Sequence, residues 1–396
     1  MAEPSPFDAA FEAGQRLQQQ RQWAAAAEAY RAAARLGLTV RLAANLGLCL
    51  HEAGDYAEAE RWLQLAARHQ PANPNIRQRL GLAYAALDKP DLAELELRTS
   101  LAFRPGDPAT ELALGGLLLS LGRLTEGWPL MEARVGLHRR AVPAVTLPYP
   151  EWLGEPLEGR SILVQVEQGL GDQIQMARFA AHLKARGAGR VTLTTRSPLK
   201  DLLARAPGVD ATVAVDAGAR VALDRHDLWT RYFTLPGRVN AGPADLWSGP
   251  YLSAPPERLA RWAPGARVGL VWQASPTGFN GARKSLPADQ ARRLLDRGLM
   301  SLHPEDTGVG DMADTAAIVA GLDLVVSIDT SVAHLAGAMG QPVWTLLPFH
   351  KTDWRWMRGR RDSPWYPTMR LYRHADREDW RGMVDQVLAE LEAEGL

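Results

Sequence analysis

The sequence is poor in cysteine and carries no net charge. Its 396 residues include one cysteine, Cys49, so the chain cannot form an internal disulfide, and we expect it in a reducing compartment such as the cytoplasm. Lys and Arg together number 45, as do Asp and Glu, so no overall field draws the chain toward nucleic acid or an anionic membrane. We therefore predict a cytoplasmic protein with no nucleic-acid partner.

Long apolar runs and metal-binding motifs are also missing. The longest apolar run, at residues 112–121, is about half of the roughly 20 residues that span a bilayer, and residues 1–10 lack the basic and apolar regions of a signal peptide. The nine histidines form no His-Glu-x-x-His pair, and a single cysteine cannot build a thiolate site. We expect no membrane insertion, no metal and no cofactor.

The chain does have enough length and apolar material for several folded domains. Hydrophobic residues make up 46% and charged residues 23%, which are ordinary globular values, and 396 residues correspond to two or three domains. The composition and pattern predict a helical-repeat domain at 1–141, a Pro-containing linker at 142–159, an α/β half at 160–256, a second α/β half at 265–378 and a final helix at 379–396.

Glycines recur every 33 or 34 residues in the first third of the chain, and small residues recur at the same period. This pattern is typical of tetratricopeptide repeats, in which pairs of helices stack into a solenoid. We predict about four repeats with a concave face that binds a protein segment; repeats that only space the protein or join it into a homo-oligomer are the alternative. The glycines are Gly14, Gly47, Gly81 and Gly115, and the small residues are Ala26, Ala59 and Ala93.

The fourth repeat departs from this pattern. Its small residue is Gly127, which is followed by Trp128 and Pro129. We therefore expect the last helix to be altered so that it docks on the residues that follow.

Beyond residue 160, short β-rich runs alternate with helical patterns. Strands that alternate with helices form parallel sheets with right-handed crossovers. The sequence therefore predicts two Rossmann-type, doubly wound α/β domains after the solenoid, with a ligand at the carboxyl ends of their strands. The predicted strands are 162–166, 191–195 and 211–215 in the first half, and 268–272, 299–302, 322–328 and 343–347 in the second.

A Gly-containing loop at 167–172 joins the first predicted strand to a helix. It is not a dinucleotide fingerprint, because Ile174 stands where a third small residue is needed and residues 189–198 hold no acidic residue for the ribose. The loop presents Asp172 at a helix N-terminus, where an ionised carboxylate is stabilised. Its role as a plain helix cap is the alternative.

Two loops of the second half are suited to a phosphate. Asp329 or Thr330 can cap the helix that begins at Ser331, whose first N–H groups and hydroxyls then face the ligand, with His334 one turn further along. A loop at 274–286 can bring Arg283 and Lys284 toward the same anion. An ordinary helix cap with a packed histidine, and surface salt bridges, are the alternatives.

Aromatic residues and arginine gather at 353–356 and 363–367, in stretches that lack a helix or strand pattern. Such a cluster beside a crevice suits stacking on a base or sugar, although aromatic residues in loops more often pack inside. We take Trp354, Trp356 and Trp365 as the candidates for stacking.

These motifs resemble those of bacterial tetratricopeptide-repeat glycosyltransferases with a heptosyltransferase-like GT-B module, a group that includes flagellin glycosyltransferases. The overall plan is also similar to that of the O-linked N-acetylglucosamine transferase. The resemblance covers nearly the whole chain. It is carried by Glu-Gln-Gly-Leu-Gly-Asp at 167–172, Asp-Thr-Ala-Ala at 314–317, Asp-Thr-Ser-Val-Ala-His-Leu-Ala-Gly at 329–337, Asp-Trp-Arg-Trp at 353–356 and Ser-Pro-Trp-Tyr-Pro at 363–367.

The resemblance implies an inverting, metal-independent GT-B glycosyltransferase that moves a sugar from a nucleotide sugar to a protein hydroxyl, with flagellin Ser or Thr as first candidate and the repeats as recruiter. It implies Asp172 as general base. A scaffold that only senses a nucleotide sugar, favoured by the short first half, and a heptosyltransferase-like enzyme acting on a glycolipid are the alternatives. The nucleotide and sugar stay open. The candidate donor-binding residues are Gly169, Gly171, Gln173, Trp272, Gln273, Arg283, Lys284, Asp329, Thr330, Ser331 and His334.

Overall fold

A computed structural model of the chain describes residues 5–137, 147–216, 218, 221–247, 249–262, 264–275, 281–375 and 378–396. The chain divides into two compact units, Met1–Leu118 and Leu119–Leu396. The predicted linker is described only from residue 147 onward, and Pro143, which helped to define it, lies outside the described residues. None of the helices within these ranges is both long and apolar enough to cross a membrane.

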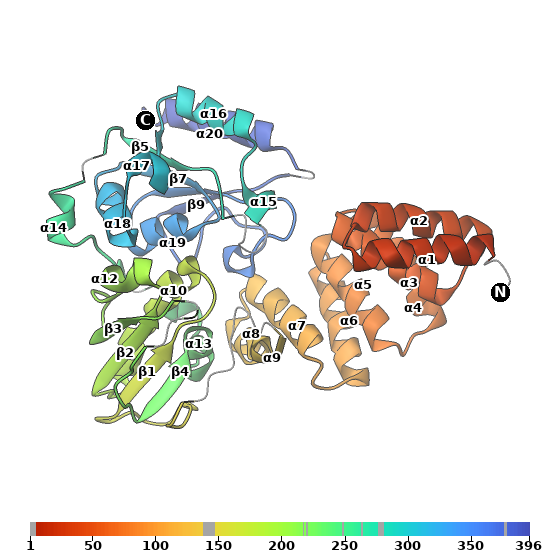
Figure 1. Cartoon of the computed structure of the whole chain (residues 1–396), viewed down its shortest axis with the longest axis horizontal. Helices are drawn as coiled ribbons and strands as arrows, with labels where there is room; N and C mark the ends of the chain where they lie inside the picture. The colour runs from red at the N-terminus through yellow and green to blue at the C-terminus, as the bar shows by residue number, and fades with distance from the viewer. Residues whose placement is uncertain are drawn as a thin grey trace. The chain divides into compact units, whose positions relative to one another are not determined.

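The first unit consists of antiparallel helix pairs (Figure 1). Side chains that precede the helices accept backbone N–H bonds from the first turn, as Thr39 and Asp55 do, and Gly54 ends a helix in the left-handed conformation at a φ of 100°. The helices are α1 (Pro6–Gln19), α2 (Trp23–Leu36), α3 (Val40–Ala53), α4 (Tyr56–His69), α5 (Pro74–Ala86), α6 (Pro90–Phe103) and α7 (Pro108–Ser120).

The recurring glycines lie where the two helices of a repeat cross. A Cβ atom at Gly47 would lie 2.6 Å from Cγ of Leu63, and one at Gly81 would lie 2.8 Å from Cγ of Leu97. Neither distance leaves room for a side chain, so the helices can approach this closely only at glycine. The predicted tetratricopeptide repeats are therefore confirmed in this unit.

Glu58 should stabilise the repeats in a pH-dependent manner. Arg31 of α2 binds both carboxylate oxygens of Glu58 on α4, and this hydrogen-bonded contact lowers the pKa of Glu58 from 4.5 to about 2. Replacing Glu58 by Gln should lower the free energy of unfolding by about 1 kcal/mol at pH 7, because the pair is only partly shielded from solvent. The folded state keeps this carboxylate ionised, so the difference should shrink as the pH falls from 4.5 toward 2.

Urea unfolding at pH 7 and pH 3, followed by far-UV circular dichroism, measures this difference. Glu12→Gln is the control, since Glu12 lies 4.0 Å from Arg16 in an exposed pair and should contribute little. An equal loss at the two pH values for Glu58→Gln would show that the ion pair is not the cause.

The second unit contains two parallel sheets. The predicted strands are confirmed, with the run at 299–302 reduced to two paired residues, and a further strand lies at an edge of each sheet. The first sheet, ordered β3-β2-β1-β4, comprises β1 (Ser161–Gln165), β2 (Arg190–Thr195), β3 (Ala211–Ala214) and β4 (Leu228–Arg231). The second, ordered β6-β5-β7-β8-β9, comprises β5 (Val268–Val271), β6 (Met300–Ser301), β7 (Leu324–Ile328), β8 (Val343–Leu346) and β9 (Met369–Tyr372).

Helices connect the strands of these sheets. The helix expected after the 167–172 loop is divided into two helices, and the first already begins at Leu170, so Asp172 lies in its first turn. The final helix packs into the core of the second sheet through Val384 and Val387. The main helices are α10 (Leu170–Ala177), α11 (Ala180–Ala185), α16 (Ala288–Asp296), α18 (Met312–Ala320), α19 (Ser331–Ala338) and α20 (Trp380–Ala393); shorter ones are α12 (Lys200–Leu203), α13 (Leu235–Arg238), α14 (Pro256–Leu259), α15 (Gly281–Lys284) and α17 (Pro304–Thr307).

Helices α8 (Leu124–Met131) and α9 (Arg134–Leu137) also belong to the second unit. The indole of Trp128 is buried and donates a hydrogen bond to the carbonyl of Ala241 at 3.1 Å, so the predicted docking of the altered fourth repeat is confirmed. The unit boundary lies at Leu118, earlier than the predicted domain end at 141, because these buried contacts attach α8 and α9 to the α/β fold.

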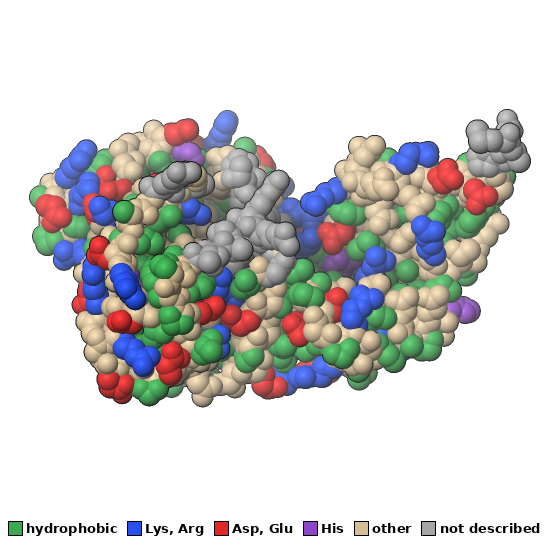
Figure 2. Space-filling view, turned by 60° about the horizontal axis from the view of Figure 1, so that its bottom comes forward, with side chains coloured by type: hydrophobic (Ala, Val, Ile, Leu, Met, Phe, Trp, Pro, Cys, Tyr) green, Lys and Arg blue, Asp and Glu red, His purple; other side chains and the backbone are tan. Residues whose placement is uncertain are grey.

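Buried polar contacts of Arg178 join the segments around the two sheets. Arg178, at the end of α10, donates to the carbonyls of Leu246 and Trp365 and to the hydroxyl of Tyr251. These contacts fix the relative position of the loops that end the strands. On the face in Figure 2, acidic and basic side chains are interspersed, as expected of a chain with equal numbers of each.

Candidate functional site

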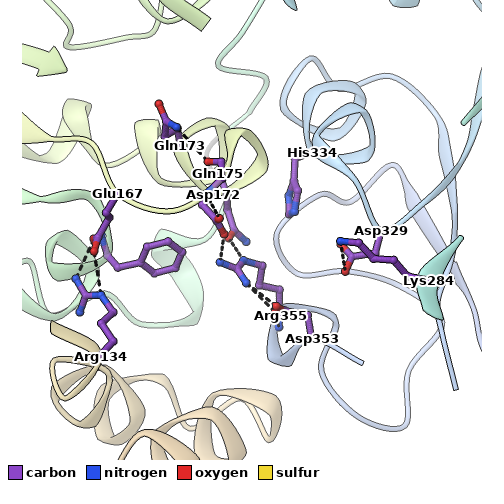
Figure 3. Close-up of polar contacts among 12 residues, drawn as sticks. Arg134, Glu167, Asp172, Gln173, Gln175, Lys284, Asp329, His334, Asp353 and Arg355 are labelled. Carbon is purple, nitrogen blue, oxygen red and sulfur yellow. Dashed lines mark hydrogen bonds and ion pairs between the residues drawn. The ribbon is translucent and has the colours of Figure 1, made fainter. Parts of the chain in front are cut away.

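The first turns of α10 and α19 meet between the two sheets (Figure 1), and Figure 3 shows the polar side chains around them. Each helix follows the carboxyl end of a strand, α10 after β1 and α19 after β7. A Cβ atom at Gly171 would lie 2.7 Å from Cδ2 of His334 and 3.4 Å from Cα of Ser331, so glycine is required for this approach. The loops at 167–172 and 329–331, predicted separately, therefore form one site.

Asp172 lies at the centre of this site. One carboxylate oxygen accepts the N–H of Gly169 at 2.7 Å, and the other pairs with the guanidinium of Arg355. Burial raises the pKa of Asp172, and the charge of Arg355 opposes this effect. The carboxylate is held in one orientation by both partners and takes up a proton more readily than an exposed aspartate does.

Arg355 is the central cation of the site, and its sequence motif did not predict a role for it. Its guanidinium binds Asp172, both oxygens of Asp353 at 2.8 Å and the amide oxygen of Gln175 at 2.6 Å. It also lies 5.0 Å from the centre of the Phe233 ring. Its position between two tryptophans after β8 was the available signal, but the partner Asp172 is 183 residues away in sequence.

Lys284 and Asp329 form the other side of the site. The lysine Nζ lies 3.8 Å from a carboxylate oxygen of Asp329, and both side chains are mostly buried. Burial raises the pKa of Asp329 to about 6, although the charge of Lys284 opposes the rise. Asp329 therefore changes its charge within the range in which many proteins work.

The start of α19 is not capped by a side chain. Thr330 occupies the N-cap position as predicted, but its hydroxyl lies 3.0 Å from that of Ser327 and accepts no N–H from the first turn, so the expected side-chain cap is not formed. Among the described residues, the Ser331 hydroxyl has no hydrogen-bond partner. The first N–H groups of α19 thus remain available to an anion.

The residues predicted after β5 are spread over a wider area. Gln273 and Arg283 are exposed, whereas Trp272 is half-buried, packs on the core of the second sheet and lies 6.3 Å from the ring of His303. Of the two predicted cations, the described contacts bring Lys284 to the carboxylate of Asp329.

His334 packs inside the fold. Its Nδ1 lies 3.0 Å from the hydroxyl of Tyr366, and its ring stacks on Trp356 at 5.1 Å. Burial lowers the pKa of His334 well below 6.5, so the ring is neutral at pH 7 and brings no positive charge to an anion. Its contact with Gly171 makes it a spacer between α10 and α19.

Three other candidate residues are removed from ligand contact by burial. Gln173 is fully buried, and its amide oxygen accepts from the Thr195 hydroxyl at 2.8 Å while its nitrogen donates to the carbonyl of Gly169. Trp356 and Trp365 have no exposed surface, so their rings offer no face to a base or sugar. Trp354 is partly exposed and packs edge-on against Trp128 and Trp365. The aromatic cluster can be seen in the sequence, but only the packing of the fold decides which of its rings are exposed to a ligand.

Metal ligands do not gather within the described ranges: no group of three or more His, Cys, Asp or Glu side chains there is placed to hold an ion.

The repeats match a known family, and a known relative matches a larger part of the chain. The tetratricopeptide repeat family model matches residues 11–75. Protein FlbA of Caulobacter vibrioides is 27% identical over 341 residues, which cover 73% of this chain and 57% of FlbA, so the chain spans little more than half of this relative. Among solved structures, MamA AMB-1 is 26% identical over 34% of this chain and 74% of that protein with a TM-score of 0.29, and the Arabidopsis OM64 TPR domain is 22% identical over 28% and 93% with a TM-score of 0.27. The family match and the helix pairs show that the chain begins with tetratricopeptide repeats, which precede an α/β region with parallel sheets.

Proposed function

We propose that the chain is an inverting glycosyltransferase of GT-B type that moves a sugar from a nucleotide sugar to a protein hydroxyl without a metal ion. The observation that carries the proposal is that Gly171, the neighbour of Asp172 in the first turn of α10, lies against Ser331 at the uncapped start of α19. The Asp172 carboxylate can accept a proton and the start of α19 can bind an anion, and sugar transfer from a nucleotide needs both.

In the proposed reaction, Asp172 removes the proton from the acceptor hydroxyl. The acceptor oxygen then attacks the anomeric carbon opposite the leaving phosphate, so the bond to the phosphate oxygen breaks and the configuration inverts. The first N–H groups of α19, the Ser331 hydroxyl and the Lys284 ammonium stabilise the negative charge on the leaving phosphate. Protonation of Asp329 near pH 6 releases Lys284 for this contact.

The repeats indicate a protein-interaction role, and this supports a protein as the acceptor. A solenoid holds an extended segment along its concave face, whereas a small glycolipid offers no such segment. By resemblance, flagellin is the first acceptor to test.

A second candidate function is a scaffold that binds a nucleotide sugar without transferring it. Its supporting observation is that the Arg355 guanidinium is fully engaged by Asp172, Asp353 and Gln175, and that Gly171 lies against His334. With Arg355 engaged in this way, the scaffold would bind the anion at the start of α19.

Calorimetry with a panel of nucleotide sugars, followed by mass spectrometry of the intact acceptor protein, separates these functions. The transfer assay is run in EDTA and again with Mn²⁺. Transfer in EDTA supports the proposal, binding without transfer supports the scaffold, and transfer only with Mn²⁺ refutes the metal-free reaction. Transfer to a glycolipid but not to protein would refute the acceptor class.

Removing the hydroxyls of Thr330 and Ser331 together should weaken donor binding by about 1 to 3 kcal/mol, the usual cost of hydrogen bonds to a charged group. We expect Ser331→Ala to account for most of this loss, because the Thr330 hydroxyl is already bonded to Ser327. Calorimetry of the single and double variants measures the effect. Thr368→Val is the control, since that hydroxyl binds the Gln341 carbonyl beside the amino end of β9. Equal affinities for the double variant and the wild type would exclude the α19 start as the donor site.

A further inference from the structure

We propose that Arg134, on the short helix that follows the last repeat, is a positioning residue for Asp172. This inference rests on the function proposed above. It assigns a role in the reaction to a residue outside both sheets, in a segment that the sequence places with the repeats.

The first observation is a buried ion pair. Nε and Nη2 of Arg134 donate to the two carboxylate oxygens of Glu167 at 3.1 and 2.9 Å, and both side chains are 1% exposed (Figure 3). The guanidinium also donates to the carbonyl of Met131 at 3.0 Å and to the hydroxyl of Thr234 at 3.1 Å. The arginine is therefore fixed from several directions.

Glu167 begins the turn that carries the candidate base. The turn passes through Gln168 at a φ of 61°, a backbone conformation that residues other than glycine rarely adopt. The next residue, Gly169, donates its N–H to the carboxylate of Asp172. The ion pair thus anchors the turn two residues before the group that orients Asp172.

A second path connects the same residues through an aromatic ring. The guanidinium of Arg134 lies 5.7 Å from the centre of the Phe233 ring and that of Arg355 lies 5.0 Å from it, while the backbone N–H of Phe233 donates to Glu167 at 2.6 Å. Arg355 in turn pairs with Asp172. Loss of Arg134 therefore removes support from both partners of the Asp172 carboxylate.

The chemistry of the pair favours positioning over stability. A buried ion pair often contributes no more to stability than apolar residues of similar volume, because both charges lose their hydration. The two-point contact between a planar guanidinium and a carboxylate instead fixes distance and angle. That property is what a turn requires when it must hold a base within reach of a hydroxyl.

The test uses the full-length chain and three variants. Arg134→Met removes the pair. Arg134→Met with Glu167→Gln removes it without leaving the Glu167 carboxylate buried and unpaired, and the glutamine oxygen can still accept from Phe233. The other carboxylate bound to Arg134, that of Glu132 at 2.8 Å, is 35% exposed and keeps its hydrogen bond from the Thr234 hydroxyl. Arg123→Met is the matched control, because Arg123 pairs with Glu126 on the surface of α8. Two quantities are measured: hydrogen–deuterium exchange of residues 166–176, and the pH profile of kcat and KM for sugar transfer.

We expect the double variant to remain folded, with exchange at 166–176 at least tenfold faster than in the wild type and other segments unchanged. Its kcat should fall by roughly 100-fold, the scale of a 1 Å misplacement, with a shifted acid limb and little change in KM. Arg123→Met should match the wild type. Wild-type exchange at 166–176 in the double variant, or unchanged kcat and pH profile, would overturn the inference.

The exchange measurement separates the two proposals. If the wild type transfers no sugar while the exchange at 166–176 still depends on Arg134, the proposed function fails and the anchoring of the turn stands. If the wild type transfers sugar and the double variant is equally active, the anchoring role fails and the proposed function stands.

Discussion

Deletion of residues 1–107 should leave nucleotide-sugar binding intact and abolish transfer to an intact acceptor protein. The unit from Leu119 to Leu396 contains both sheets together with α8 and α9, so the donor site keeps all of its described partners. Trp128 and Arg134 remain in the shortened chain and continue to bind Ala241 and Glu167. What the deletion removes is the surface on which the proposal places the acceptor.

Calorimetry and mass spectrometry of the acceptor protein measure the two effects. A longer deletion, of residues 1–141, is the control, because it also removes Trp128 and Arg134 and should lose folding or nucleotide binding as well. Equal transfer rates for the full-length chain and the chain lacking residues 1–107 would show that the repeats do not recruit the acceptor.

Asp172→Asn should reduce kcat by 10²- to 10⁴-fold, the usual contribution of a general base. The amide oxygen of asparagine can still accept the N–H of Gly169, so the first turn of α10 keeps its hydrogen bond. As the pH falls, the wild type should lose activity before the pH reaches 3.8, the ordinary pKa of an aspartate. Burial raises the pKa of Asp172 above this value, and only the ionised carboxylate accepts a proton. The variant should lack this limb.

Asp245→Asn is the matched control for this substitution. Asp245 accepts the N–H of Gly242 at 2.8 Å, three residues before it, in the same arrangement as Asp172 and Gly169 but outside the candidate site. Asp245 also lies 3.3 Å from Nε2 of His182, so its replacement removes a capping carboxylate together with that contact, and it should leave kcat unchanged. A kcat for Asp172→Asn equal to that of the wild type would remove the assignment of the base.

The sequence by itself determined the repeats and most of the strands. Glycines such as Gly47 and Gly81 recur at one period because the same helix crossing recurs, and every repeat contacts mainly its neighbours. Strands β1 and β7 are buried, apolar runs bounded by turns, so their pattern is local as well. Strand β4 carries Arg231 in its four residues, and this weakened its apolar pattern.

The tertiary structure decided which residues come together in the candidate site. Arg355 and Asp172 are 183 residues apart, and Arg134 and Glu167 were placed in different predicted domains. No period or motif connects such pairs, because their contact depends on how α9, α10 and the loop after β8 pack together.

Burial then decided which of the expected residues a ligand can reach. Asp172, Lys284 and Ser331 lie at the carboxyl ends of the strands, where the parallel topology predicted a ligand site. Gln173 and Trp356 have the right residue type and spacing, but neighbouring side chains enclose them completely. Residue type and spacing are properties of the chain, whereas exposure depends on the elements that pack over it. The sequence alone therefore predicted where a candidate site lies, and only the fold decided which of its residues are exposed.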